Sequence, residues 1–375
     1  MKTLSLVGGS RGLGFALLQQ LKDHYDLIHL FDIENPIEKE TNTHFHKFDL
    51  SKDNVLSISK YICSSDDLII TAGVGQVKPF IDCSVSEIKN LFLINTISNI
   101  QIVRLFFENL LCKKDCHCLF MGSIAGEVCS PLFATYGASK ASIYQLCESL
   151  NIELEKKGSS NRITYVSATS FDGTSFNGKD TDLSKIAPVA VECICAMKNK
   201  ETKHYINPEL CKDVISRYNK DSHSFGLSSY EYKMKSGRIS HKKQVIGYLS
   251  GTFDLFHIGH LNILRRAKAE CDYLIVGVHE DGSWKGKETF IPFEERLEII
   301  RSVKYVDEAD KSLKEDSEAW NKYHFDKLFV GSDYKGSERF KKYEEFFKDK
   351  GVQIVYFPYT KGTSSSQLRE KLVTK

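Results

Sequence analysis

The sequence predicts an α/β protein with two doubly wound parallel-sheet domains in tandem. Short apolar runs that end at Gly or Asp alternate with longer, helix-length periodic stretches. This alternation implies right-handed crossovers and parallel sheets covered on both faces. The chain has 375 residues, 41% of them hydrophobic, so it can bury more than one core. A polar stretch near residues 216–243 lacks apolar periodicity and separates two such series.

The first series predicts a domain over residues 1–215. Each predicted strand is a short apolar run that a turn-forming residue closes. The predicted strands are residues 3–7, 27–31, 67–71, 118–121 and 163–167. The predicted helices include residues 15–21, 86–111 and 136–157.

The second series predicts a smaller domain over residues 244–375, joined to the first by a linker at 216–243. The two domains are not repeats, because their glycine and histidine signatures differ. The predicted strands are residues 244–249, 274–278, 327–330 and 353–357. The predicted helices are residues 261–270, 293–302, 337–350 and 364–372.

The composition argues against nucleic acid and membranes as partners. The 51 Lys and Arg nearly balance the 49 Asp and Glu, which removes a bulk electrostatic attraction. The least polar stretch, residues 91–102, is shorter than the ~20 apolar residues that cross a bilayer. The 11 Cys are scattered and odd in number. We therefore expect reduced structural thiols, no metal site and a cytoplasmic location.

The first glycine turn is typical of a Rossmann-like dinucleotide site. Residues 8–14, Gly-Gly-Ser-Arg-Gly-Leu-Gly, follow the first strand and open the first helix. Glycines let backbone N–H groups approach a pyrophosphate at a helix N-terminus. Asp32 ends the second strand, 18 residues after Gly14, where an acid can hold a ribose 2′-hydroxyl.

Three further residues indicate carbonyl reduction. Tyr136 and Lys140 are four residues apart on a predicted helix, so they share a face. Ser123 follows a strand, at the edge where a parallel sheet presents its ligands. A nearby ammonium lowers the pKa of a phenol from its usual ~10, and a Ser hydroxyl can orient the carbonyl oxygen.

Residues 1–210 resemble the short-chain dehydrogenase/reductase family, in which these motifs occur together with Asp49, Thr71-Ala-Gly73 and Asn95. The resemblance implies Tyr136 as general acid/base, Lys140 as its pKa-lowering and ribose-binding partner, and Ser123 as the carbonyl polariser. It makes Asn95 a residue that positions a water or the Lys. The residues expected to bind the cofactor are Gly8, Ser10, Arg11, Gly12, Leu13, Gly14, Asp32, Asp49, Ala72, Gly73, Tyr136 and Lys140.

The cofactor choice between NADPH and NADH stays open. Arg11 suits a 2′-phosphate, whereas Asp32 would repel one; a reductive biosynthetic role favours NADPH slightly. The family's Pro-Gly after the fifth strand is absent from residues 167–173, and the loop that follows is short. The substrate pocket is therefore undefined by the sequence.

A second glycine turn, residues 251–260, carries His257 and His260 at the start of a predicted helix. Both imidazoles can face one anion, and the helix N-terminus adds backbone donors. Zinc ligation and ordinary core histidines are the less favoured alternatives. The sequence offers no third or fourth zinc ligand at a plausible interval and no His-Glu-x-x-His pattern.

Residues 244–375 closely resemble the cytidylyltransferases, above all the glycerol-3-phosphate type, through this turn and residues 293–296, 304–308, 330–333 and 360–366. The resemblance implies in-line attack of an alcohol phosphate on CTP, with Mg²⁺ as companion and both His stabilising the transition state. The expected nucleotide-binding residues are Gly251, Thr252, Phe253, His257, His260, Lys285, Lys287, Arg296, Asp333, Thr360, Ser364, Ser365 and Ser366.

Tyr359 and Lys361 stand where that family has an Arg and an acid, so CTP rather than ATP rests on the overall resemblance. Together the two resemblances suggest consecutive steps. A phosphorylated ketose or aldehyde would become an alditol phosphate, such as ribitol 5-phosphate, and then a CDP-alditol for capsule or teichoic-acid-like polymers.

Two alternatives remain for the first domain. It could reduce an unrelated carbonyl compound beside a glycerol-3-phosphate cytidylyltransferase, or it could be a non-catalytic cofactor-binding or dimerising module. The small-molecule partners are the phosphorylated substrate and CTP. By resemblance alone we also expect a homo-oligomer.

Overall fold

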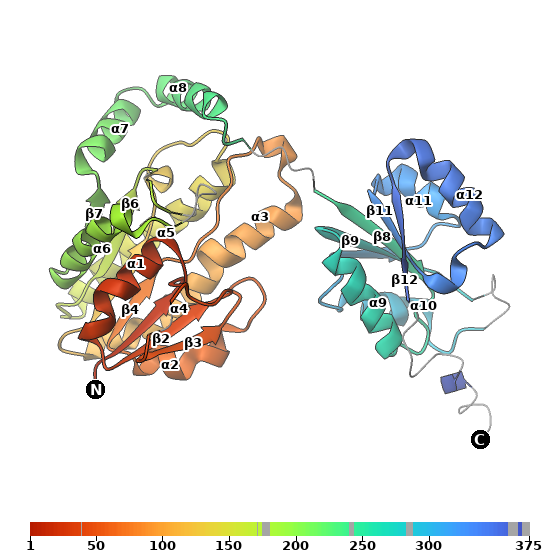
Figure 1. Cartoon of the computed structure of the whole chain (residues 1–375), viewed down its shortest axis with the longest axis horizontal. Helices are drawn as coiled ribbons and strands as arrows, with labels where there is room; N and C mark the ends of the chain where they lie inside the picture. Colours follow the sequence, from red (N-terminus) through yellow and green to blue (C-terminus); the bar gives the residue numbers. More distant parts are fainter. Residues whose placement is uncertain are drawn as a thin grey trace. The chain divides into compact units, whose positions relative to one another are not determined.

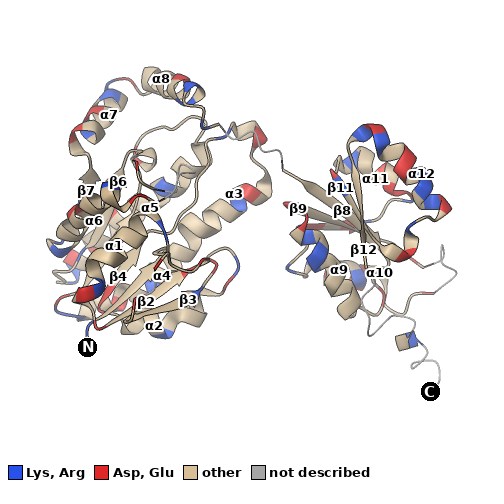
Figure 2. Cartoon of the chain, in the orientation of Figure 1, with Lys and Arg blue, Asp and Glu red and all other residues tan. Residues whose placement is uncertain are grey.

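The computed structural model describes residues 1–38, 40–170, 172–174, 181–239, 244–282, 288–358 and 367–369. The chain forms two compact units, unit 1 (Met1–His241) and unit 2 (Lys242–Lys375). Each unit has its own parallel sheet with helices on both faces, which confirms the predicted α/β fold class (Figure 1). Lys and Arg are interspersed with Asp and Glu along the helices of both units (Figure 2).

The sheet of unit 1 has the strand order β3-β2-β1-β4-β5-β6-β7, and all pairs are parallel. The order reverses between β1 and β4, so a crevice opens at the carboxyl ends of these two strands. The strands are β1 (Thr3–Val7), β2 (Leu27–Asp32), β3 (Thr43–Lys47), β4 (Asp67–Ile70), β5 (His117–Met121), β6 (Ile163–Ala168) and β7 (Lys203–Ile206).

Helices cover both faces of this sheet. One core cluster joins α1 and α6 to the sheet, and the other joins α2, α4 and α5. The helices are α1 (Gly12–Leu21), α2 (Ser59–Ser64), α3 (Val85–Phe92), α4 (Ser98–Cys112), α5 (Ala134–Lys156), α6 (Leu183–Lys198), α7 (Pro208–Lys220) and α8 (Ser222–Lys235). Shorter helical turns are η1 (Lys22–His24), η2 (Val55–Ile58), η3 (Phe80–Asp82), the π-helical η4 (Leu93–Ile97) and η5 (Ile124–Gly126).

The helical run Val85–Cys112 is long and apolar enough to cross a membrane by length and composition alone. A core helix of a soluble domain passes the same test. Here Ile102, Phe106 and Leu110 are fully buried in the core of unit 1, so packing against the sheet accounts for these apolar residues.

The segment 216–243, expected as an irregular linker, differs from that expectation. It contains the end of α7 and all of α8, and the units divide after His241. Helix α8 belongs to unit 1 and packs against the segment that contains Cys129. A Cβ added at Gly226 of this helix would lie 3.3 Å from Cys129 Sγ. The helix has no fully buried residue, which explains why its sequence shows no apolar periodicity.

Unit 2 has the strand order β10-β9-β8-β11-β12, again all parallel, with its reversal between β8 and β11. The strands are β8 (Ile246–Gly251), β9 (Tyr273–Val278), β10 (Glu308–Lys311), β11 (Lys327–Gly331) and β12 (Gln353–Phe357). The helices are α9 (Ile258–Ala269), α10 (Phe293–Arg301), α11 (Asp316–Tyr323) and α12 (Glu338–Phe347), with the turns η8 (Ser332–Tyr334) and η9 (Lys348–Lys350). Of the helix expected at 364–372, only residues 367–369 are described, and they are helical.

All 11 Cys are free thiols. Cys116, Cys118, Cys147, Cys193 and Cys211 are buried. Within the described residues, no group of three or more His, Cys, Asp or Glu side chains could hold a metal ion.

Candidate active sites

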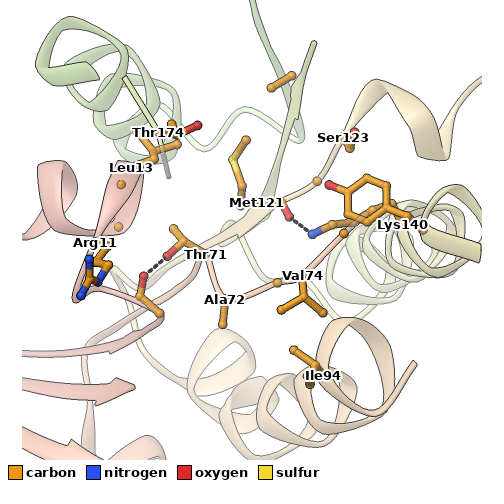
Figure 3. A pocket seen from close by; sticks show the side chains of 18 of the residues that line it. Arg11, Leu13, Thr71, Ala72, Val74, Ile94, Met121, Ser123, Lys140 and Thr174 are labelled. Atoms are coloured by element: carbon orange, nitrogen blue, oxygen red, sulfur yellow. Dashed lines mark hydrogen bonds between the residues drawn. The ribbon is translucent and has the colours of Figure 1, made fainter. Parts of the chain in front are cut away.

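A cavity of about 790 Å³ opens at the carboxyl edge of the unit 1 sheet (Figure 3). Its volume is in the range of cofactor and substrate pockets. Its wall contains most of the residues that the sequence predicts for this site. They are Gly8, Ser10, Arg11, Gly12, Leu13, Gly14, Asp32, Asp49, Ala72, Gly73, Ser123, Tyr136 and Lys140.

The glycine turn after β1 is packed too tightly for larger residues. Gly8 has φ +89°, and a Cβ there would lie 2.4 Å from the Ala72 nitrogen. A Cβ on Gly14 would lie 2.0 Å from the Gly8 oxygen. The Thr71 hydroxyl donates to the same oxygen at 2.6 Å. The N-terminus of α1 is therefore held against the cavity, where its dipole and N–H groups suit a pyrophosphate.

Carboxylates dominate the part of the cavity beyond β2. Asp32 accepts hydrogen bonds from the backbone N–H groups of Ser10 at 3.0 Å and Ile33 at 2.7 Å. Arg11 Nε donates to Glu34 Oε2 at 2.7 Å. Because Glu34 engages the guanidinium, the charge that would attract a 2′-phosphate is partly neutralised.

Ser123 is fixed from behind by Tyr165. The Ser123 N–H donates to the Tyr165 hydroxyl at 3.0 Å, and that hydroxyl donates to the Ser123 oxygen at 3.1 Å. A Cβ on Gly122 would lie 2.0 Å from the Tyr165 ring. Ser123 Oγ accepts from the Ala125 N–H at 3.2 Å, which leaves its own proton to donate.

Tyr136 and Lys140 lie on one face of α5 and are both buried, with 5% and 2% exposure. The Phe133 ring stacks on the Tyr136 ring at 4.1 Å. The Lys140 ammonium donates to the Met121 oxygen at 2.9 Å (Figure 3) and lies 5.8 Å from the centre of the Tyr136 ring.

The pKa values of these two groups differ from the sequence-based expectation. Burial raises the pKa of Tyr136 to about 12, against a lowering effect of its hydrogen bond with Ser123. Burial also lowers the pKa of Lys140 to about 8. The expected lowering of the phenol pKa by the ammonium is absent, because desolvation outweighs an attraction over this distance.

Asn95 lies in the π-helical turn η4 behind the cavity and is fully buried. Its amide donates to the Val74 oxygen at 2.8 Å and to Ser139 Oγ at 3.1 Å, and its oxygen accepts from the Val74 N–H at 2.8 Å. A Cβ on Gly73 would lie 3.4 Å from the Asn95 side-chain oxygen and 3.2 Å from Lys140 Nζ. Asn95 therefore positions the segment after β4 beside the Lys.

In unit 2, His257 and His260 come together as expected. Their rings stack at 4.0 Å, with His257 as the N-cap of α9. His257 Nδ1 accepts from the Gly259 N–H at 3.0 Å, so the neutral ring carries its proton on Nε2. Burial lowers the pKa of His257, which keeps the ring neutral and able to donate from Nε2.

The turn before α9 is strained. Phe253 and Leu255 both have positive φ, +53° and +50°, a region that non-glycine residues rarely adopt. The Phe253 ring is buried, lies edge-on to His260 at 5.4 Å, and would be 3.0 Å from a Cβ on Gly251. The predicted residues Gly251, Thr252 and Phe253 thus shape the turn that presents the two imidazoles.

Arg296 differs from the expected direct contact with substrate. Its side chain has 0% exposure. Its guanidinium donates to the backbone oxygens of Ile291, Thr252, His279 and Glu280 at 2.6–2.9 Å. Arg296 therefore ties the ends of β8 and β9 to the start of α10.

Asp333 is exposed in η8, just after β11, at the carboxyl edge of the sheet. The other predicted nucleotide-binding residues lie outside the described residues. They are Lys285, Lys287, Thr360, Ser364, Ser365 and Ser366.

The structure adds residues that the sequence analysis missed. Asp254 is buried, accepts from the N–H groups of Phe290 and Ile291 at about 3.1 Å, and pairs with Arg369. Lys233 of α8 lines the unit 1 cavity. Asp254 lies within the glycine turn at 251–260, so that motif could have drawn attention to it. Lys233 belongs to no motif, and only its place in the fold identifies it.

Family models match both units. One described as short chain dehydrogenase matches residues 2–182, and one described as cytidylyltransferase-like matches residues 248–371. Glycerol-3-phosphate cytidylyltransferase of Bacillus subtilis is 34% identical over 134 residues, which are 35% of this chain and 97% of that protein. The Staphylococcus aureus protein of the same name is 33% identical, over 36% of this chain and 97% of that protein.

Unit 1 has more distant relatives. Dehydrogenase RED2 of Cochliobolus heterostrophus is 29% identical over 166 residues, 42% of this chain and 63% of that protein. A crystal structure of a short chain dehydrogenase from Burkholderia cenocepacia in complex with NADP has a TM-score of 0.52 at 16% identity. It covers 61% of this chain and 99% of its own, and at this identity it supports the fold alone.

Proposed function

Because the chain belongs to the cytidylyltransferase family through unit 2 and carries a short-chain dehydrogenase in unit 1, we propose that it catalyses two consecutive reactions. Unit 1 reduces a phosphorylated ketose or aldehyde to an alditol phosphate, such as ribitol 5-phosphate. Unit 2 transfers the cytidylyl group of CTP to that product and releases pyrophosphate. The supporting observation is that one chain holds a proton-donating Tyr136 in a cofactor-sized cavity and the stacked pair His257–His260 at a helix N-terminus.

In the reduction, the nicotinamide cofactor supplies the hydride for the carbonyl carbon. Tyr136 gives its proton to the carbonyl oxygen, since its raised pKa keeps the phenol protonated at neutral pH. Ser123 Oγ donates a hydrogen bond to the same oxygen. The Lys140 ammonium stabilises the phenolate that remains.

We propose NADH as the preferred cofactor. Asp32 faces the cavity as a carboxylate, and Glu34 engages Arg11. A ribose 2′-hydroxyl can donate to Asp32, whereas a 2′-phosphate would meet two acids and one paired guanidinium. These contacts outweigh the slight preference for NADPH drawn from the sequence.

In the transfer, a phosphate oxygen of the alditol phosphate attacks the α-phosphorus of CTP, and pyrophosphate leaves in line. His257 Nε2 and the His260 ring donate to the phosphoryl oxygens, whose charge grows in the transition state. Mg²⁺ bound together with CTP would neutralise part of the phosphate charge; the described residues form no metal-holding cluster of their own.

The test is an incubation of the full chain with CTP, Mg²⁺, NADH or NADPH and a panel of phosphorylated ketoses and aldehydes. Mass spectrometry should detect a CDP-alditol only when the carbonyl compound, the reduced cofactor and CTP are all present. Tyr136→Phe should abolish reduction and spare transfer to a preformed alditol phosphate. His260→Ala should do the reverse, and a reductase product that unit 2 refuses would contradict the two-step proposal.

The names of the Bacillus and Staphylococcus relatives favour one alternative, in which unit 2 acts on glycerol 3-phosphate beside an unrelated reductase. If dihydroxyacetone phosphate is reduced and CDP-glycerol forms, the two-step proposal holds for the three-carbon substrate. If glycerol 3-phosphate is used but no phosphorylated carbonyl compound oxidises the cofactor, the alternative is favoured. No oxidation with any carbonyl compound would favour a non-catalytic module.

We further propose that the protein acts as a homo-oligomer in the cytoplasm and that its product feeds polymers of the teichoic-acid or capsule kind. Light scattering tests the oligomeric state, and cell fractionation tests the location. Loss of such a polymer after gene deletion, restored by the active chain but not by His260→Ala, tests the fate of the product.

A further inference from the structure

Lys233 of helix α8 reaches into the wall of the unit 1 cavity. Its ammonium donates to Ser130 Oγ at 2.8 Å, to the Pro131 oxygen at 3.0 Å and to Ser229 Oγ at 3.1 Å. All three partners are neutral oxygens. Among the residues that the structure describes, no carboxylate lies within 4.0 Å of this nitrogen.

This ammonium is held in a partly desolvated place without a counter-charge. Burial lowers the pKa of Lys233 to about 8, so most of the population is still charged at pH 7. By contrast, Arg11, which also lines the cavity, is paired with Glu34. A partly buried charge without an ion-pair partner is costly for the fold, which is typical of a group kept for an anionic ligand.

The cavity is electrically polarised along the sheet edge. Asp32 ends β2, and the acids Glu34 and Asp49 follow β2 and β3, at one side of the strand order. Lys233 and Ser170 lie near the ends of β5 and β6. Three strand spacings between β2 and β5 amount to roughly 15 Å. The acidic side suits the adenosine ribose, and the basic side is left for a negatively charged substrate.

The same end carries a second cation. Arg238, which follows α8, donates from Nη1 to Ser170 Oγ at 3.1 Å, and Ser170 lines the cavity. No ion pair joins Arg238 to a carboxylate of the described residues. An anion at this rim would therefore find one partly buried and one exposed positive charge.

Lys233 is tied to the segment that presents Tyr136. Its partner Ser130 accepts from the Phe133 N–H through its backbone oxygen at 3.0 Å, and the Phe133 ring stacks on Tyr136 at 4.1 Å. Ser130 Cβ would also lie 3.6 Å from a Cβ on Gly137, the residue after Tyr136. The ammonium is thus anchored to the turn that leads directly into the catalytic helix α5.

We propose that Lys233, with Ser130 beside it and Arg238 at the rim, binds the phosphate group of the compound that unit 1 reduces. The proposal rests on the proposed reductase function and assigns specificity for phosphorylated carbonyl compounds to helix α8. Lys233 is a substrate-binding residue and takes no part in proton transfer.

The first experiment titrates inorganic phosphate into the complex of the full chain with NADH and follows the fluorescence of the bound NADH. This signal reports unit 1, so phosphate that binds at unit 2 does not contribute. Phosphate should change the emission in a saturable way. Lys233→Met should weaken the apparent affinity by about tenfold or more, and Lys233→Arg should retain most of it.

Lys235→Met is the matched control, because Lys235 is an exposed residue in the last turn of the same helix. This variant should bind phosphate like the wild type.

The second experiment compares a phosphorylated carbonyl substrate with its unphosphorylated counterpart. Lys233→Met should raise KM for the phosphorylated compound by about tenfold with little change in kcat. It should leave kcat/KM for the unphosphorylated compound unchanged.

The outcomes separate this inference from the proposed function. If Lys233→Met only loosened helix α8, kcat/KM would fall equally for the phosphorylated and the unphosphorylated compound, and that result would overturn the inference. Phosphate affinity and KM values in Lys233→Met that match the wild type would also overturn it. Both results leave the reductase function standing. A protein that takes up no nicotinamide cofactor would instead contradict the proposed function itself.

Discussion

The ammonium of Lys140 lies 5.8 Å from the centre of the Tyr136 ring, and its hydrogen bond goes to the Met121 oxygen. Both side chains are buried. The phenol is therefore protonated and the ammonium is partly destabilised at neutral pH. This is a resting state suited to giving a proton away, as reduction requires.

Lys140→Met should stabilise unit 1 at neutral pH while it abolishes reduction. Below pH 8 the Lys is charged in both the folded and the unfolded state, and its burial lowers the free energy of unfolding. We expect a melting temperature higher by ~2–4 °C at pH 7, the effect of about 1 kcal/mol in a domain of this size. Circular dichroism measures it.

The pH dependence of that difference has a definite sign. Between pH 8 and 10.5 the folded state has lost the Lys140 proton and the unfolded state still holds it, so wild-type stability rises relative to the variant. The gap in melting temperature should shrink towards pH 10.5. A gap that widens with pH would contradict the lowered pKa.

Asp32→Ser should shift cofactor use towards NADPH. The variant removes a carboxylate that would repel a 2′-phosphate and keeps an acceptor for the Ser10 N–H. We expect kcat/KM with NADPH to rise by about tenfold or more, the effect of removing roughly 1.4 kcal/mol of repulsion. Steady-state kinetics with both cofactors measures the change.

Glu34→Gln tests the same interpretation independently, because it releases the charge of Arg11 from its ion pair. This variant should also improve NADPH use, without changing the contacts of Asp32. Equal kcat/KM for NADH and NADPH in the wild-type protein would show that the acidic end of the cavity does not select the cofactor.

Two substitutions of His257 separate its roles as helix cap and phosphate donor. His257→Asn keeps a side-chain acceptor for the first turn of α9 but loses the donor at the Nε2 position. Its stability should be near that of the wild type, with cytidylyl transfer slower by about 10²-fold. His257→Gln carries an amide near the Nε2 position but loses the cap.

His257→Gln should therefore cost stability, about 1 kcal/mol, and retain more transfer than His257→Asn. Urea unfolding and a pyrophosphate-release assay measure the two quantities. The reverse ranking of the two transfer rates would contradict donation from Nε2.

Arg296→Met should unfold unit 2 more readily rather than only weaken CTP binding. Four backbone oxygens would lose their buried donor, which should lower the free energy of unfolding by about 3 kcal/mol or more. Both tryptophans of the chain, Trp284 and Trp320, belong to unit 2. Their fluorescence in urea therefore reports this unit.

Arg301→Gln on the same helix is the control for that experiment, because Arg301 makes one long hydrogen bond to the Ala309 oxygen. Arg301→Gln should unfold at the same urea concentration as the wild type. If Arg296→Met also keeps the wild-type urea midpoint but has a raised KM for CTP, the sequence-based interpretation of a direct substrate contact would be correct.

The sequence predicted the cavity of unit 1 well because parallel topology carries distant segments to one sheet edge. Gly8, Asp32, Gly73 and Ser123 each follow an apolar strand, and such positions meet wherever the strands are parallel. The i, i+4 spacing of Tyr136 and Lys140 similarly placed them on one face of α5.

The missed strands share a physical cause. Strands β3 and β7 are edge strands of the unit 1 sheet with sequences Thr-His-Phe-His-Lys and Lys-His-Tyr-Ile. Strand β10 is the corresponding edge in unit 2 and reads Glu-Ala-Asp-Lys. An edge strand buries little, so alternation of apolar residues is weak or absent.

The direction of pKa shifts and the role of Arg296 depend on burial, which a local motif does not encode. The spacing of Tyr136 and Lys140 predicted that the two side chains lie on one helix face. It did not predict the desolvation that raises the pKa of the phenol. Arg296 belongs to a motif that resembles a substrate contact, yet its guanidinium donates to backbone oxygens of three segments.

Helix α8 also limits how the polypeptide can be divided. A fragment that stops where the apolar pattern fades, near residue 215, would lack helix α8 and with it the part of the cavity wall that Lys233 forms. Truncation after residue 241 would preserve that wall. Separate expression of the two halves therefore requires the cut to follow the packing boundary and not the change in composition.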